Sequence, residues 1–388
     1  MSTYTYLFTD LLTGQVLADL PCYGVHLETK LNGIGNTTFS IKLGTEYDVN
    51  DIVNSTIPGR TCMYADRDGT LVWGGVVWSR TYQTNGNSFE YTAQTFESLA
   101  DKRKWTGPGD SGGPTKTYQN AEQLQILLDM WNYMQSVAGT NYGIIVPSLA
   151  GIGGASGILR NLVLNSWELR TIGDITRSLS QLANGFDWNI AVQYDGTGKP
   201  IKQLRVGYPG LGIPAQKSGT LFDQPGNIKN LWWPESAADA GTWDWAIGAG
   251  EGTSQLLALA QNANLLNAGW PVLERDDSYK DINDPAMLQA QAAVDLGLYQ
   301  PPIVSPSADI DPSFPDPALG SYQCGDYVRV VVEGTKPDPL TGRVTNERGD
   351  PRWPQGLDTF LRITGMTIDP PEGETNENVH CDFMQVVN

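Results

Sequence analysis

Alternation of apolar and polar residues over the first hundred positions constrains the fold of this chain most. In "VHLETKL" (25–31), Val25, Leu27, Thr29 and Leu31 fall at every second position, and in "TFSIKLG" (38–44), Phe39, Ile41 and Leu43 do the same. This period of two places successive side chains on opposite faces of a β-strand. Two turn signals typical of β-hairpins separate further alternating runs, at Asp68-Gly69 and Asn85-Gly86. We therefore expect residues 1–104 to form a β-domain.

The pattern changes to helical spacing after a Gly/Pro-rich loop that begins near residue 105. The segment "NAEQLQILLDMWNYMQ" (120–135) predicts a helix capped by Asn120, and "TIGDITRSLSQLANG" (171–185) predicts a second helix. Alternating runs at 186–192 and 203–208 predict two strands joined by a turn. We expect residues 105–222 to form a smaller α/β domain.

The last part of the chain, residues 223–388, again predicts mostly short strands. One helix is expected at about 285–296, behind Asp284-Pro285, and the Pro-rich stretch 301–319 is expected to be an extended connector. Residues 57–77 and 323–368 share an order of turn glycine, strand, loop and glycine-containing strand. This weak internal repeat predicts two related β-barrel domains that flank the α/β domain. The expected class is α+β, mainly β.

Charge and composition exclude several functions. The chain has 388 residues, with 25 Lys and Arg against 43 Asp and Glu, for a formal charge of −18, so its net field does not attract a phosphate backbone. No secretion signal and no apolar run of about 18 residues is present, so we expect no membrane insertion. Four scattered cysteines and two histidines give no zinc motif. We expect no cofactor and no metal site.

The string "GPGDSGGP" (107–114) contains Ser111 in the context of a serine-protease nucleophile or a hydrolase elbow. A protease needs a His, an Asp and two barrels in a set chain order, and only His26 precedes Ser111. A hydrolase elbow needs an apolar strand before the serine and a helix directly after it, and neither is expected here. His380 lies in an alternating terminal strand. We therefore expect a linker at a domain border and no catalytic residue.

Other candidate motifs favour structural interpretations. The glycines of 149–158 do not fit a phosphate-binding loop, and "ADRDG" (65–69) lacks the downstream Glu of a calcium loop. Acidic pairs that could act on a glycan are common in so acidic a chain; the examples are Glu274, Asp276, Asp277, Asp281 and Asp284. Four tryptophans could stack on sugar rings, but core or interface roles are the simpler interpretation; they are Trp232, Trp233, Trp243 and Trp245.

Three stretches of the first domain resemble the minor tail proteins of long-tailed actinobacteriophages. They are "YLFTDLLTGQVLADLPCYGVHLETKLN", "STIPGRTCMYADRDGTLVWGGVVWSRTY" and "FEYTAQTFESLADKR". The similarity extends through "TIGDITRSLSQLANGFDWNIAV" and the "CGDYVRVVV … FLRITGMTI" arrangement. Proteins of this family resemble the baseplate or tail hub at the distal end of the tail tube.

The resemblance implies a structural virion protein, not an enzyme, at the distal end of the tail and assembled in the host cytoplasm. It implies a homotrimer in which two tube-like barrels per chain give a ring of six that continues the tail tube. Implied partners are the distal tail protein ring, the tape measure protein, tip or receptor-binding proteins, and viral DNA in transit only. Because the last strands reach Asn388, we expect no wall-cleaving extension.

Three alternatives remain at this point. The chain could be a wall hydrolase that uses Ser111 or an acidic pair, or a cell-wall glycan-binding tip module that uses the tryptophans of 231–248. It could also be the hexameric distal tail protein, which an oligomer mass would distinguish from a trimer.

Overall fold

A computed structural model describes residues 2–44, 47–107, 113, 115–334, 353–373 and 375–385. Contacts divide the chain into two compact units. The larger unit comprises Met1–Ser180, Phe186–Leu231 and Ser307–Asn388, and the smaller unit comprises Gln181–Gly185 and Trp232–Pro306. No helix among the described residues is long and apolar enough to cross a lipid bilayer.

A sheet of 13 strands forms the larger unit, and its strands follow the order β14-β20-β23-β22-β3-β4-β7-β6-β5-β1-β2, with β21 joining β22 to β13. The strands are β1 (Tyr4–Asp10), β2 (Val16–Asp19), β3 (Tyr23–Lys30), β4 (Asn36–Lys42), β5 (Thr61–Arg67), β6 (Thr70–Gln83), β7 (Ser88–Thr95), β13 (Leu221–Gln224), β14 (Ile228–Trp232), β20 (Ser307–Ile310), β21 (Tyr327–Val332), β22 (Leu357–Asp369) and β23 (Asn378–Gln385). The expected class, mainly β with helices, is confirmed. Among the described residues the paired strands follow an open order and do not close into a barrel.

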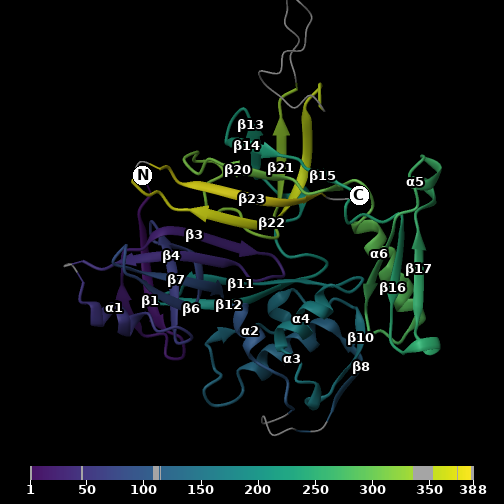
Figure 1. The fold of residues 1–388 in the computed structure, drawn as a ribbon, viewed down its shortest axis with the longest axis horizontal. Coiled ribbons are helices and arrows are strands. Elements are labelled where there is room, and N and C mark those ends of the chain that lie inside the picture. Colours follow the sequence, from purple (N-terminus) through teal and green to yellow (C-terminus); the bar gives the residue numbers. More distant parts are fainter. Residues whose placement is uncertain are drawn as a thin grey trace, which may run out of the picture. The chain divides into compact units, whose positions relative to one another are not determined.

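The first and last segments of the chain meet in this sheet. Strand β3 pairs antiparallel with β22, with Glu28 opposite Thr367 and Lys30 opposite Gly365. Figure 1 shows the two strands side by side, β3 in purple and β22 in yellow. The division into 1–104, 105–222 and 223–388 stays a prediction, but two of its segments share one sheet.

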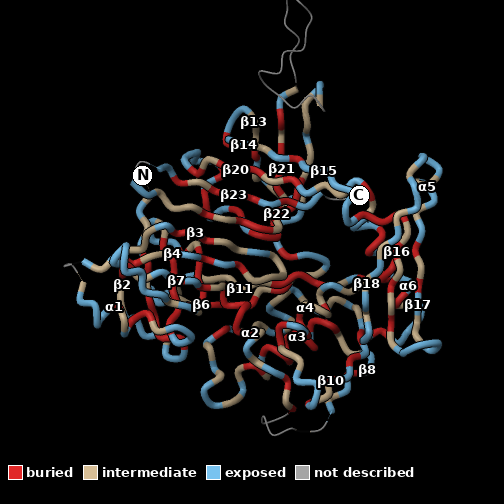
Figure 2. Tube along the Cα trace, viewed as in Figure 1, coloured by how far each residue is buried: buried red, intermediate tan, exposed pale blue. Residues whose placement is uncertain are grey.

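Smaller elements complete the larger unit. Two further sheets contain β8 (Lys116–Glu122) with β10 (Leu159–Leu164), and β9 (Ile144–Ile145) with β11 (Asp187–Tyr194) and β12 (Pro200–Gly207). The helices are α1 (Val49–Ser55), α2 (Ser98–Lys102), α3 (Gln123–Met134) and α4 (Ile172–Ser180), with 3-10 turns at Ala150–Ile152, Ser166–Glu168 and Ala215–Lys217. Buried residues run along the strands and through α3, as Figure 2 shows.

The smaller unit is built on the three-stranded sheet β17-β16-β18. Its elements are β15 (Glu235–Ser236), β16 (Trp243–Ile247), a 3-10 turn (Gly252–Ser254), β17 (Leu257–Gln261), α5 (Ala263–Asn267), β18 (Glu274–Ser278), α6 (Pro285–Leu298) and β19 (Ile303–Val304). Helix α6 packs on the sheet through a small core that includes Ala246, Leu288 and Ala292. Asp284 caps α6 by accepting hydrogen bonds from the backbone of Ala286 and Met287, so the predicted helix start is confirmed.

Two local predictions were wrong. Asn120 does not cap the first long helix: it lies in β8 with a positive φ of 46°, and the Glu122 side chain accepts from Leu124 N instead. The strand continues to Glu122 because it pairs with β10, which sequence spacing does not reveal. The Pro-rich stretch 301–319 is not only a connector, because it contains β20, which pairs with β23 inside the large sheet.

Candidate functional site

A broad polar surface lies where the first and last segments meet. Alternation in β3 buries Val25 and Leu27 and leaves His26 exposed, as predicted. Register and side-chain contacts place residues of β4, β7, β20, β22 and β23 on the same side of the sheet. We call this surface the polar sheet face; its residues are His26, Glu28, Lys30, Asn36, Gln94, Asp309, Thr367, Asp369, His380 and Asp382.

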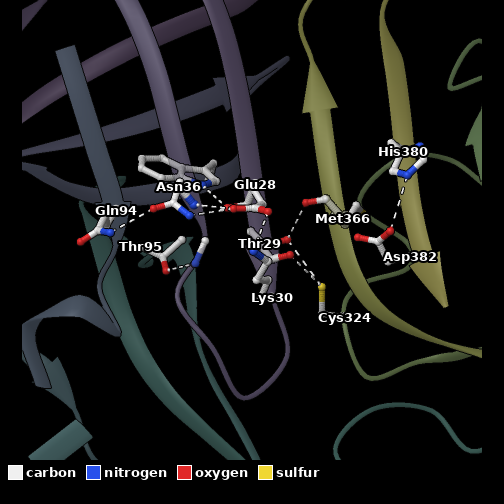
Figure 3. A network of polar contacts seen from close by, with 12 residues as sticks. Glu28, Thr29, Lys30, Asn36, Gln94, Thr95, Cys324, Met366, His380 and Asp382 are labelled. Carbon is white, nitrogen blue, oxygen red and sulfur yellow. Dashed lines mark hydrogen bonds and ion pairs between the residues drawn. The ribbon is translucent and has the colours of Figure 1, made fainter. Parts of the chain in front are cut away.

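Hydrogen bonds connect neighbouring strands across this face (Figure 3). Glu28 Oε2 accepts from both N and Nδ2 of Asn36 at 3.0 Å, and Lys30 Nζ lies 2.8 Å from Glu28 Oε1. Gln94 Nε2 donates to Asn36 Oδ1 at 3.0 Å. Toward β22, the other strand that neighbours β3, Thr29 Oγ1 donates to the Met366 carbonyl at 3.3 Å. The network therefore ties β7, β4, β3 and β22 together.

Both histidines of the chain lie on the polar sheet face and contact carboxylates. His26 Nδ1 lies 2.6 Å from Asp369 Oδ1, and His380 Nδ1 lies 2.8 Å from Asp309 Oδ1. Burial alone would raise the pKa of Asp309, but hydrogen bonds from Asn230 and His380 outweigh it and lower that pKa. With four carboxylates against one lysine, the face is acidic.

Beside this face, Asp187 joins three distant segments of the larger unit. It accepts from Asn32 Nδ2 at 2.7 Å and from Leu211 N at 3.0 Å, and it forms a buried ion pair with Arg362. Arg362 also donates to the carbonyl oxygens of Gly325 (3.0 Å) and Leu211 (2.8 Å). A buried ion pair with its remaining donors and acceptors satisfied fixes geometry. No sequence motif indicated this junction.

A second surface lies on the sheet of the smaller unit, on the side away from α6. Trp243 and Trp245 alternate with the buried Asp244 and Ala246, so both half-buried indoles are on this side. Glu274 and Asp276 of β18 stand opposite the two tryptophans in register. Of the other candidate tryptophans, Trp232 is exposed and Trp233 is buried.

Two of the candidate acidic residues, Asp277 and Asp284, have structural roles in the smaller unit. Asp277 forms an ion pair with Arg275 at 2.7 Å, and Asp284 caps α6. Among the described residues, one group of carboxylates lies close enough to share a metal ion, and it consists of Asp244, Asp277 and Asp295. Two of these residues were not singled out in the sequence, because they lie on elements whose proximity spacing does not reveal.

The remaining candidates are placed as follows. Ser111 lies outside the described residues, as do its neighbours from 108 to 112. Residues 149–158 contain a 3-10 turn and glycines with positive φ, and 65–69 contain the tight β5–β6 hairpin turn, where Asp68 has φ 51° and Gly69 has φ 87°. The hairpin interpretation of 65–69 is therefore confirmed.

Comparison with known proteins identifies relatives by fold only. No protein-family model and no curated protein matches the sequence. The 43 kDa tail protein of prophage MuSo2 from Shewanella oneidensis is similar with a TM-score of 0.60 and 10% identity over 98% of both chains. A tail protein from Neisseria meningitidis has a TM-score of 0.55 and 10% identity, over 98% of this chain and 96% of its own.

A prophage tail protein from Listeria monocytogenes is also similar, with a TM-score of 0.50 and 10% identity over 97% of this chain and 94% of its own. At this identity the likeness concerns architecture and not the residues of any site. The chain therefore has the fold of these phage tail proteins over nearly its whole length.

Proposed function

We propose that this protein is a structural, non-enzymatic component of a phage tail tip, the hub at the distal end of the tail. The observation that carries the proposal is the fold similarity to a prophage tail protein over 98% of both chains. The sequence resemblance to minor tail proteins of actinobacteriophages supports the same role independently of the fold.

In the proposed assembly three copies form the hub, and each contributes two tube-like β-regions to a ring of six. The shared sheet of the larger unit supports this arrangement, because β3–β22 pairing joins the first and last segments in one sheet. The proposed neighbours are the distal tail protein ring, the tape measure protein and tip or receptor-binding proteins. Assembly would take place in the host cytoplasm.

We further propose that the polar sheet face lines part of the DNA exit channel. Four carboxylates on this face, in a chain with a formal charge of −18, would repel phosphates and let DNA slide without binding. The hydrogen bonds among Glu28, Asn36 and Gln94 would keep the wall in one conformation.

The mass of the native oligomer tests the proposed stoichiometry. A trimer corresponds to three copies of the 42.3 kDa chain, and the hexameric distal tail protein corresponds to six. Native mass spectrometry of the purified protein, alone and on tail assemblies, should give three copies. A mass of six copies would favour the distal tail protein alternative.

A second candidate function is glycan binding by the sheet face of the smaller unit that carries Trp243 and Trp245. It is favoured by the two half-buried indoles of Trp243 and Trp245, which lie on one side of β16 opposite Glu274 and Asp276. Aromatic rings stack on sugars, and carboxylates accept hydrogen bonds from hydroxyl groups. Glycan-array binding that is lost in Trp245→Ala but kept in Trp232→Ala would support this candidate.

A further inference from the structure

Helix α6 covers a sheet face that is apolar in the middle and charged at one end. Ala246 on β16 and Ala258 and Ala260 on β17 pack against Leu288 and Ala292 of α6. Asp244 lies two residues before Ala246 in β16, and Asp295 lies three residues after Ala292 in α6. The parallel pairing of β16 with β18 brings Asp277 to the same side of the sheet.

The three carboxylates converge. Asp244, Asp277 and Asp295 each offer an oxygen within 4.8 Å of those of the other two. Two oxygens that bind one Ca²⁺ at about 2.4 Å lie at most about 4.8 Å apart, so the three pairwise separations are those of oxygens that share an ion. The three residues come from three different elements that are adjacent only in the folded unit.

Asp244 supplies an independent observation that indicates a ligand. Its side chain is 0% exposed, and its Oδ1 atom has no hydrogen-bond partner within the described part of the chain. Leaving a charged oxygen buried and unsatisfied is costly, and native proteins normally pair such atoms or coordinate a metal with them. The other oxygen, Oδ2, accepts from Arg275 Nη1 at 2.6 Å.

Charge compensation within the cluster is incomplete. Arg275 contacts both Asp244 and Asp277, and its guanidinium lies 3.7 Å from the ring centroid of Tyr299. Asp295 has only neutral donors, Tyr279 Oη at 2.7 Å and Gln291 Nε2 at 3.1 Å. Three carboxylates therefore face one cation, which leaves two negative charges in a largely buried place.

We propose that Asp244, Asp277 and Asp295 bind one divalent cation, with Ca²⁺ favoured over Mg²⁺, and that the ion fastens α6 to β16 and β18. A divalent ion neutralises the two uncompensated charges and gives Asp244 Oδ1 a partner. Three carboxylates suit Ca²⁺, whereas Mg²⁺ usually keeps several waters and uses one or two carboxylates. The proposal goes beyond the tail-tip role and does not depend on it.

The titratable and charged groups that face one another in the cluster are Asp244, Arg275, Asp277, Tyr279 and Asp295.

Metal titration of the full-length protein tests the proposal. After treatment with a chelator and its removal, Ca²⁺ should raise the melting temperature and give saturable heat in calorimetry, and Mg²⁺ should act more weakly. Tb³⁺, a luminescent substitute for Ca²⁺, should be excited through Tyr279 and Tyr299 and be displaced by Ca²⁺.

Variants separate a metal site from a salt-bridge cluster. Asp244→Asn, Asp295→Asn and the less buried Asp277→Asn should each lose the Ca²⁺-dependent shift and the Tb³⁺ signal. Asp276→Asn removes the same charge from the opposite side of β18 and should keep both. Arg275→Gln should bind Ca²⁺ more tightly, because it removes the competing cation.

Either of two results would overturn the proposal. The first is that neither Ca²⁺ nor Mg²⁺ binds or stabilises the wild-type protein. The second is that Asp277→Asn, folded as judged by circular dichroism, binds Ca²⁺ as well as the wild type does. Ca²⁺ binding by a protein that proves absent from phage tails would leave this proposal intact.

Discussion

Glu97 is an unusual residue of the larger unit because its carboxyl group is buried without a cationic partner. It lies between β7 and α2, and its Oε1 accepts from Ile190 N at 2.6 Å. A cavity of about 250 Å³ adjoins it and is also lined by Asn189. Among the residues that the structure describes, Glu97 Oε2 and Asn189 Oδ1 are buried without a partner within hydrogen-bond geometry. Burial raises the pKa of Glu97 to about 7.

This pKa makes stability depend on pH near neutrality. An unfolded chain releases the Glu97 proton near the ordinary glutamate pKa, and the folded protein keeps it until about pH 7. Between these values the folded state binds more protons, so the free energy of unfolding falls as pH rises. The raised pKa corresponds to a loss of unfolding free energy on the order of 3 kcal/mol as the pH rises from the ordinary glutamate pKa to about 7.

Glu97→Gln should remove this pH dependence, because glutamine stays neutral and can still accept from Ile190 N. Urea unfolding at a series of pH values, from acidic to mildly alkaline, measures this pH dependence. Above neutral pH the variant should have a larger free energy of unfolding than the wild type. Glu90→Gln, which changes an exposed carboxyl group of the neighbouring strand β7, is the control and should follow the wild type. A wild type and a Glu97→Gln variant with parallel pH profiles would contradict the raised pKa.

At the scale of elements, short-range signals in the sequence predicted the strands and hairpins well. Asp68-Gly69 formed the expected turn, and the two glycines of the weak repeat, Gly59 and Gly325, both adopt positive φ. The strand pairs that follow them, β5–β6 and β21–β22, are both antiparallel and enter the same sheet. These features depend on a few adjacent residues, which a sequence displays directly.

Features that depend on distant partners could not be read from the sequence. The β3–β22 pairing, the Asp187 junction and the Asp244 cluster each join residues far apart in the chain. Polar residues such as Asp187 and Asp295 look like surface residues until their burial is known. The smaller unit could not be predicted as a separate unit either, because its core consists largely of alanines and not of a long apolar run.

Gly75 offers a test of element packing, because it lies inside β6 where this strand pairs with β7. A Cβ atom at this position would lie 2.2 Å from the carbonyl oxygen of Gln94 on β7, so the two strands would have to move apart. Gly75→Ala should lower the free energy of unfolding by about 2–3 kcal/mol. Gly196→Ala has no atom within 4 Å of its new Cβ and should be nearly neutral in the same urea titration. Equal stability of the two variants would show that β6 and β7 are not so close.

At the scale of the whole molecule, the proposed channel role requires weak interaction with DNA. A formal charge of −18 and an acidic polar sheet face predict no retention of duplex DNA, even at low salt, where phosphate contacts are strongest. Fluorescence anisotropy with labelled duplex measures this. Binding of the duplex that weakens steeply with added salt would reveal a basic surface and would contradict the proposal that DNA slides along this face.

The tail-tip proposal is tested most directly by a cryo-electron microscopy reconstruction of the tail with this chain located in it. We predict three copies around the tail axis at the distal end, with β3, β22 and β23 presenting the polar sheet face to the channel. Six copies in a ring, a position away from the tip, or absence from the tail would contradict the account.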